Sequence, residues 1–143
     1  MQKTITSEQD MIDFGTELAK DFSGGDIVLL HGDLGAGKTT ITKGIAKGLG
    51  IDNDIVSPTF SIMNVYEIES LKSKVKSLVH IDTYRLEQED DLIEIGVEDY
   101  LGNENYICVV EWPEKITSLL DGKKVINVEI EHIDGGRRIQ INT

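Results

Sequence analysis

The apolar residues of this chain follow two different periods, and the change from one to the other predicts helices interspersed with strands. Residues 11–22 carry an apolar side chain at about every third or fourth position, the spacing of a helix with one buried face. Ser7 and Asp10 form a capping-box pattern at the start of this helix, and the glycines at 24 and 25 end it. Residues 27–30 are apolar without a break, as in a strand buried on both faces.

The same two periods continue through the rest of the chain. Ile41, Ile45 and Leu49 predict a helix from about Lys38 to Gly48. Rough alternation over 61–68 and 75–81 predicts one β-hairpin, and clearer alternation over 123–133 and 137–141 predicts a second, C-terminal hairpin. Short helices are expected over 87–100, broken by a glycine, and over 113–120, with an apolar strand at 106–111. Because hairpins are antiparallel, the sheet is expected to be mixed.

Composition limits the class of protein. The 143 residues are expected to form one domain over residues 1–143. No apolar run approaches the ~20 residues that span a bilayer, and the N-terminus has no apolar leader pattern, so a cytoplasmic location without membrane contact is expected. The lone cysteine, Cys108, excludes an internal disulfide and fits a reducing compartment. With a net charge of −12 and three arginines, stand-alone nucleic-acid binding is not expected.

The segment between the buried strand at 27–30 and the helix at 38–48 holds the most specific motif. Gly32, Gly37, Lys38 and Thr39 match G-x-x-x-x-G-K-[ST]. Such a loop turns successive backbone N–H groups toward a phosphate, and the helix after it adds its positive end. The residues expected to bind nucleotide here are Leu34, Gly35, Ala36, Gly37, Lys38, Thr39 and Thr40. We therefore predict an α/β, single-domain P-loop NTPase fold with a mixed β-sheet flanked by helices and a C-terminal β-hairpin.

Two acids end predicted strands, where the sites of α/β proteins gather. Glu111 closes the apolar run 106–110 as in a Walker-B strand, where it would bind Mg²⁺ or orient water. The alternative is a strand-end glutamate that faces solvent. Asp82 ends the strand before it. Thr59, in the polar loop 57–60, is a candidate to present oxygen to Mg²⁺ or the γ-phosphate, although spacing alone favours an ordinary turn. The three histidines show no zinc spacing and are interpreted as structural.

These residues favour ATP as the nucleotide. The chain lacks the N-K-x-D loop typical of guanine recognition, and three arginines are few for a nucleoside-monophosphate kinase. In the simplest mechanism, Thr39 and Glu111 bind Mg²⁺, Lys38 neutralises the transferring phosphoryl group, and Asp82 orients water. No internal arginine finger is evident, so turnover is expected to be slow until a partner completes the site.

Together the motifs resemble the bacterial TsaE (YjeE) family of P-loop ATPases required for threonylcarbamoyladenosine formation in tRNA. The matching segments are 32–40, 57–60, 80–86 and 110–114. The resemblance implies ATP and Mg²⁺ as ligands, with Lys38, Asp82 and Glu111 as catalytic residues, Thr39 and Glu111 at the metal, and 57–60 as a switch. It also places Glu8 and Arg137 near the adenine and ribose.

The partners that the resemblance implies are the transferase subunit TsaD and its companion TsaB, with tRNA reached only through that complex. Two alternatives remain open. In one, ATP occupancy rather than hydrolysis controls partner assembly, and the chain is a nucleotide-gated regulatory binding subunit. In the other, the chain phosphorylates a small molecule.

Overall fold

The fold is a mixed sheet between two layers of helices. The computed structural model describes residues 1–33, 35–56, 62–69 and 74–143. The elements are β1 (Gln2–Ile5), α1 (Glu8–Ala19), β2 (Ile27–His31), α2 (Lys38–Gly48), β3 (Met63–Glu67), β4 (Ser77–Asp82), α3 (Glu89–Glu94), η1 (Val97–Asp99), β5 (Tyr106–Glu111), η2 (Pro113–Ile116), α4 (Thr117–Leu120), β6 (Val125–Ile133) and β7 (Gly136–Asn142). The predicted mixed α/β fold is confirmed.

The seven strands lie in the order β1-β7-β6-β2-β5-β4-β3. β2 pairs in parallel with β5 and β6, and β5 pairs in parallel with β4. The β3–β4 and β6–β7 pairs are antiparallel, as the two hairpins predicted from alternation require. Residues 57–61, before β3, and residues 70–73, between β3 and β4, lie outside the described residues. Strands β2 and β5 are buried except at His31 and Tyr106, because helices cover both of their faces.

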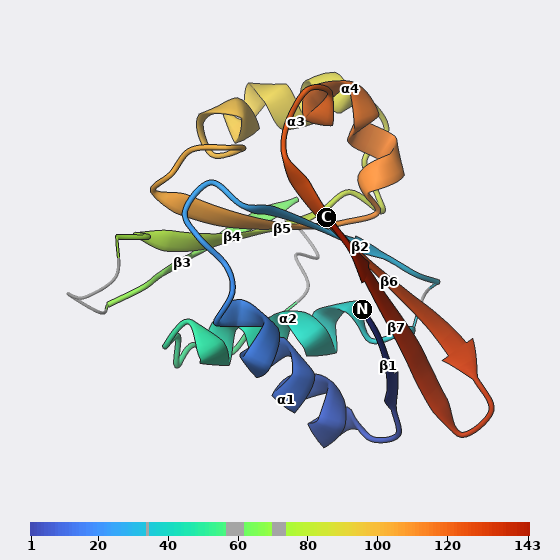
Figure 1. The fold of residues 1–143 in the computed structure, drawn as a ribbon. Helices are drawn as coiled ribbons and strands as arrows, with labels where there is room; N and C mark the ends of the chain where they lie inside the picture. The colour runs from blue at the N-terminus through green and yellow to red at the C-terminus, as the bar shows by residue number, and fades with distance from the viewer. Residues whose placement is uncertain (34, 57–61, 70–73) are drawn as a thin grey trace.

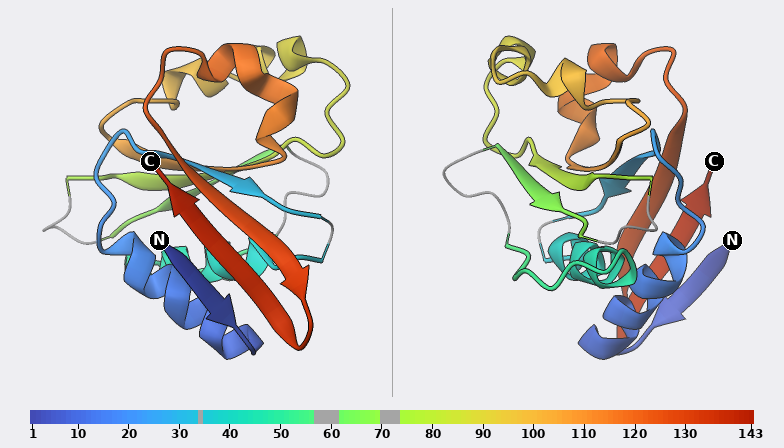
Figure 2. Two further views of the ribbon diagram at one scale, coloured as in Figure 1. Left: turned by 45° about the vertical axis from the view of Figure 1, so that its right-hand side comes forward. Right: turned by 90° about the vertical axis from the view of Figure 1, so that its left-hand side faces the viewer.

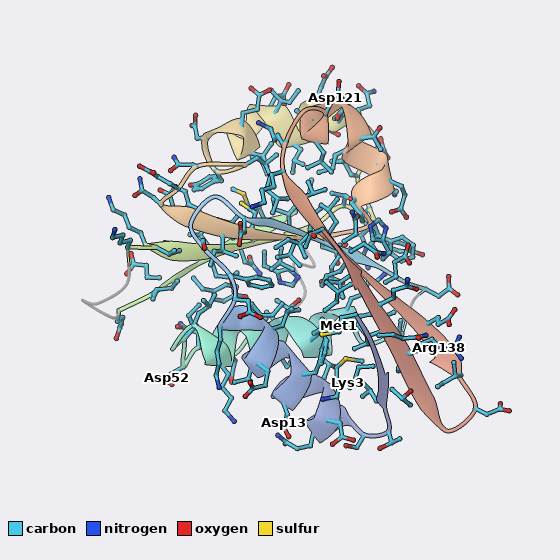
Figure 3. All side chains as sticks on the ribbon, in the orientation of Figure 1. Met1, Lys3, Asp13, Asp52, Asp121 and Arg138 are labelled. Carbon is cyan, nitrogen blue, oxygen red and sulfur yellow. The ribbon has the colours of Figure 1, made fainter. Side chains whose placement is uncertain are left out.

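Helices α1 and α2 cover one face of the sheet, and α3, η1, η2 and α4 cover the other (Figures 1 and 2). Each face has its own apolar core. Charged side chains such as Asp13, Asp52 and Asp121 lie on the outside of the molecule (Figure 3). In the described part of the chain, none of the helices combines the length and the apolar character that a membrane span requires.

Helix α1 fixes the position of α2, and therefore of the residues at the start of α2. Ser7 caps α1 by accepting a hydrogen bond from the backbone N–H of Asp10 at 3.0 Å. The two helices then meet at glycines, and a Cβ added at Gly44 would lie 2.2 Å from the carbonyl oxygen of Ile12. The hydroxyl of Thr16 donates across this contact to the carbonyl of Gly44 at 3.1 Å. The close approach therefore depends on the absence of a side chain.

Two elements differ from the sequence-based prediction. Strand β1 was not predicted, yet it pairs antiparallel with β7 along its whole length, so the C-terminal hairpin is not the edge of the sheet. The helix predicted over 113–120 is a 3₁₀ turn followed by a short α-helix, because Ile116 leaves helical geometry at φ −130° and ψ 34°. Ile116 is completely buried in the core beneath.

Candidate functional site

The loop between β2 and α2 bends at glycines, as the motif predicted. Gly35 and Gly37 have φ of +78° and +113°, a region that L side chains rarely adopt. Gly37 is the residue before the first turn of α2, so the free N–H groups of that turn face the loop. Leu34 lies outside the described residues. The loop and the helix start therefore form the strand–loop–helix arrangement that binds phosphates in P-loop proteins.

Lys38 lies buried at the start of α2, with 5% of its surface exposed. Its Nζ donates to the carbonyl of Gly32 at 2.6 Å and lies 3.4 Å from the centroid of the Trp112 ring. Burial lowers the pKa of Lys38, and the negative charges of Glu111 and Asp82 oppose that shift. The ammonium group is thus enclosed by a carbonyl, an aromatic face and a field of carboxylates.

Glu111 and Asp82 end adjacent strands in the same register. They are paired residues of the parallel strands β5 and β4, and Leu30 of β2 pairs with Glu111 on the other side. The carboxyl ends of three central strands therefore meet beside the loop, as Asp82 and Glu111 were predicted to do. Glu111 is only 3% exposed, so the alternative of a strand-end glutamate facing solvent is wrong.

Glu111 has a buried partner, His80. The Nε2 of His80 lies 2.5 Å from Oε2 of Glu111, and the ring is fully buried. The other ring nitrogen, Nδ1, has no hydrogen-bond partner within the described part of the chain. Asp82 accepts a hydrogen bond from the backbone N–H of Tyr84 at 3.0 Å. The histidine, interpreted from sequence as structural, is thus a direct neighbour of a predicted metal residue.

The predicted Mg²⁺ site combines Thr39 at the start of α2 with Glu111. A hydroxyl and a carboxylate are hard oxygen donors of the kind Mg²⁺ prefers, together with phosphate oxygens and water. Over residues 1–33, 35–56, 62–69 and 74–143, no group of three or more His, Cys, Asp or Glu side chains is arranged to hold a metal. Thr39 and Glu111 supply two donors of this kind, so Mg²⁺ held there would take its other ligands from phosphate oxygens and water. Thr59 lies outside the described residues.

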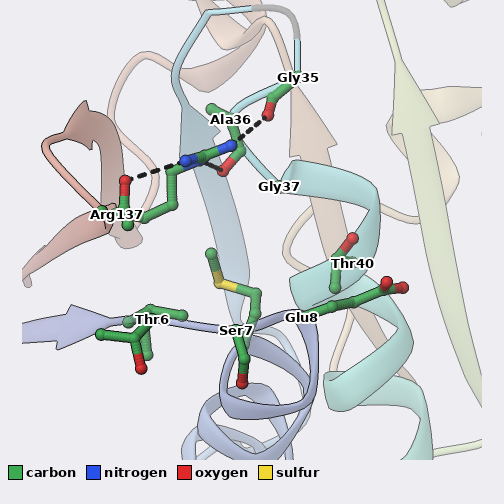
Figure 4. A pocket seen from close by; sticks show the side chains of 12 residues that line it. Thr6, Ser7, Glu8, Gly35, Ala36, Gly37, Thr40 and Arg137 are labelled. Carbon is green, nitrogen blue, oxygen red and sulfur yellow. Dashed lines mark hydrogen bonds between the residues drawn. The ribbon is translucent and has the colours of Figure 1, made fainter.

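A pocket of about 430 Å³ opens on the other side of the loop, toward α1 and β7 (Figure 4). Glu8 enters it from the first turn of α1 and extends toward Thr40 on α2. The remaining lining includes Gly35, Ala36, Gly37 and Arg137, so the structure brings together the residues that the resemblance placed near the nucleoside. Lys38, Glu111 and Asp82 belong to the strand-end side instead.

Arg137 contacts the loop itself. Its guanidinium donates to the carbonyls of Ala36 at 3.2 Å and Gly35 at 3.3 Å, and to the carbonyl of Gly136 at 2.9 Å (Figure 4). Because these loop carbonyls accept hydrogen bonds from a group outside the loop, the N–H groups of the loop can point inward, where they can bind an anion. Sequence reasoning did not find this contact, because it joins residues about a hundred positions apart.

Trp112 and His80 are the site neighbours whose place the sequence left open or missed. The structure places the ring of Trp112 against Lys38, a contact that the position of Trp112 after the strand does not by itself predict. For His80 a signal was present: it lies two positions before Asp82 on one strand, and residues two apart share a face of a sheet.

The chain is similar to known proteins along most of its length. The model of the family described as "Threonylcarbamoyl adenosine biosynthesis protein TsaE" matches residues 5–139. Two proteins named "tRNA threonylcarbamoyladenosine biosynthesis protein TsaE" are similar over most of the chain. The one from Haemophilus influenzae is 34% identical over 142 residues, covering 96% of this chain and 85% of the relative. The one from Treponema pallidum is 35% identical, covering 99% of each.

A solved structure shares the fold. The crystal structure of Bacillus subtilis YdiB aligns with a TM-score of 0.79 and 29% identity, over 99% of this chain and 83% of that one. The family match spans every element from Ile5 to Ile139, including the loop, both strand-end acids and Arg137. The resemblance inferred from the motifs is confirmed, and the chain belongs to the TsaE family of threonylcarbamoyl adenosine biosynthesis proteins.

Proposed function

We propose that this chain binds and slowly hydrolyses ATP with Mg²⁺, in support of the complex that forms threonylcarbamoyladenosine in tRNA. One observation carries the proposal: a buried lysine at the start of α2 lies in the field of two acids that end adjacent parallel strands. An ammonium, two carboxylates and a loop of backbone N–H groups are the parts that phosphoryl transfer from a nucleotide requires.

Each group has a separate part in the proposed reaction. The loop amides and Lys38 bind the β- and γ-phosphates, and Lys38 stabilises the negative charge that develops on the transferring group. Thr39 and Glu111 hold Mg²⁺, which when bound neutralises phosphate charge. Asp82 orients the attacking water. Each charge-assisted contact is expected to contribute about 1.5–3 kcal/mol.

The pocket between α1 and β7 would receive the nucleoside. Glu8 offers acceptor oxygens of the kind that a ribose hydroxyl or an adenine amino group donates to, and Met11 adds an apolar surface. Arg137 stabilises the loop from the side of this pocket. The adenosine would thus lie on the hairpin side of the loop and the reacting phosphate on the side of the strand ends.

The proposed partners are TsaD and TsaB, and the acidity of the chain supports an indirect path to tRNA. With a net charge of −12, the chain would repel a free polyanion, so other subunits would supply the positive surface. Arg137 donates hydrogen bonds to carbonyls of the loop, and Arg138 donates to the carboxylate of Glu131. We therefore expect a partner to supply the missing charge stabilisation.

ATP turnover with and without TsaD, TsaB and tRNA tests the proposal. Low basal hydrolysis that rises in the assembly is expected, and equal rates would refute a partner-completed site. Asp82→Asn and Glu111→Gln should bind ATP without hydrolysing it, while the exposed Asp121→Asn serves as a matched control. If both site variants still support repeated modification cycles, ATP occupancy rather than hydrolysis is the function. A phosphorylated metabolite formed in step with ADP would identify a kinase.

A further inference from the structure

The turn after Glu111 has an unusual backbone. Trp112 has φ of +60° and ψ of +51°, and it is the one non-glycine residue with positive φ in the described part of the chain. A bulky side chain disfavours this left-handed conformation, so the surroundings must hold the residue in place. The turn therefore requires contacts that a glycine would not need.

Thr83 provides such contacts. Its Oγ1 lies 2.5 Å from the carbonyl oxygen of Trp112 and 3.1 Å from that of Glu111, and its backbone N–H donates to the same Glu111 carbonyl at 3.2 Å. Thr83 directly follows Asp82 and is completely buried. A single hydroxyl therefore joins the end of β4 to the turn that follows β5, with both predicted acids beside it.

The other side of the turn reaches the lysine of the loop. The ring of Trp112 lies against the Lys38 ammonium, and the ring of Tyr84 lies against Trp112 with 5.0 Å between centroids. Lys115 in turn donates to the carbonyl of Tyr84. The backbone angles of Trp112 set the direction of its Cα–Cβ bond and restrict its rotamers, so whatever holds those angles also helps to set where the ring meets Lys38.

We propose that Thr83 is a positioning residue, whose buried hydroxyl holds the Glu111–Trp112 turn and thereby fixes the Trp112 ring against Lys38. The proposed consequence for catalysis rests on the function proposed above, whereas the consequence for the ring does not. If Thr83 had only a structural role, its contribution would come from its methyl group, which fills volume in the core. The two roles belong to different atoms of one side chain and can be separated.

Two matched pairs of variants isolate the hydroxyl. Thr83→Val removes the hydroxyl and keeps the shape, and Thr83→Ser compared with Thr83→Ala removes it where the methyl is already absent. Trp112 is the only tryptophan of the chain, so its fluorescence reports this turn alone. A control outside the site is Thr16→Val, which removes another hydroxyl shared between two carbonyls, those of Ile12 and Gly44.

If the hydroxyl positions the turn, wild type and Thr83→Ser are expected to have the same tryptophan emission maximum and the same acrylamide-quenching constant. Thr83→Val and Thr83→Ala shift the emission to longer wavelength and increase quenching. Their kcat for ATP falls by about tenfold or more, with a smaller change in KM, because a displaced group costs rate more than binding. Thr16→Val lowers thermal stability and leaves the emission unchanged.

Two results would overturn the proposal. One is emission and quenching unchanged in Thr83→Val and Thr83→Ala, and the other is Thr83→Ser altered as much as Thr83→Ala, which would assign the role to the methyl group. If Thr83→Val does not fold, judged by circular dichroism, the serine–alanine pair decides alone. A wild-type protein that hydrolyses no ATP would refute the proposed function, and the fluorescence comparison would still decide the role of Thr83.

Discussion

Arg137 should matter for ATP binding more than its half-buried position suggests. Its guanidinium bridges the turn of the C-terminal hairpin to two carbonyls of the phosphate-binding loop. Arg137→Ala removes both bridges, so the loop loses the contacts that keep its carbonyls outside and its N–H groups inside. The free loop then samples more conformations, and ATP binding must order it again.

The size of the effect follows from the geometry. A hydrogen bond from a charged donor contributes about 1.5–3 kcal/mol when short and buried. The two bridges are long, at 3.2 and 3.3 Å, and partly exposed, so together they are expected to contribute about that same amount. The Kd for ATP should therefore rise roughly 10–100-fold. Arg137→Lys keeps the charge and loses the planar fork, so it should recover only a small part.

Arg138→Ala is the matched control for calorimetric titration with ATP and Mg²⁺. It removes the same charge from the next residue, whose side chain pairs with the exposed Glu131 instead of the loop. Such exposed pairs contribute about 0–1 kcal/mol, so the Kd for ATP should stay within about twofold of wild type. Equal losses in both variants would show that net charge rather than loop geometry governs binding. Wild-type affinity in Arg137→Ala would refute the bridging role.

Three further predictions concern stability. Gly44→Ala should lower the free energy of unfolding by about 1–2 kcal/mol. The new Cβ lies 2.2 Å from a backbone oxygen of α1, so overpacking costs close to the upper end of about 1–3 kcal/mol, and helix propensity returns ~1 kcal/mol. An unchanged or higher Tm would contradict this. Burial lowers the pKa of Lys38, so the unfolded chain binds that proton more tightly than the folded chain does. The free energy of unfolding of wild type should therefore rise relative to that of Lys38→Met as pH increases toward about 10.5. Urea titrations at several pH values test this, and a constant difference between the two proteins would show that it is wrong. His80→Phe should cost about 1.5–3 kcal/mol, because it leaves the buried Glu111 carboxyl group without this hydrogen-bond partner. His80→Gln keeps a donor and should cost less, and thermal unfolding of both variants decides.

The elements that could be predicted from the sequence are those whose signal is local. The stripe on α1, the unbroken run of β2 and the alternation of β6 each give their period within one segment. Strand β1 lacks such a signal, because Ile5 is its only buried residue and the pairing that makes it a strand lies with β7 at the other end of the chain. Its existence depends on a partner that local pattern does not contain.

The candidate site divides in the same way. The phosphate-binding loop is contiguous, so its motif predicts its geometry, and the two acids could be placed because parallel strands end at one edge. The contacts of Trp112, Thr83 and Arg137 depend on tertiary structure instead. The positive φ of Trp112 has no sequence signal at all, since glycine or asparagine is the residue expected there.

The strand order explains why residues so far apart in the chain serve one loop. β2 lies between β5 on one side and β6 on the other, so the loop after β2 faces a different set of groups on each flank. The flank of β5 and β4 carries Glu111, His80 and Asp82, which are acids and a histidine. The flank of β6 and β7 carries Arg137 and, across the pocket, Glu8.

The two flanks should therefore control different steps. The strand-end flank contains the groups suited to a metal and an attacking water, so changes there should act on kcat for ATP. The hairpin flank shapes the loop and the nucleoside pocket, so changes there should act on Kd. The guanidinium of Arg137 donates to the carbonyls of Gly35, Ala36 and Gly136, which all lie on the loop and the hairpin, and effects of groups without shared contacts usually add. A partner that completes the chemistry would then need to reach the strand-end flank alone and could leave the nucleoside pocket untouched.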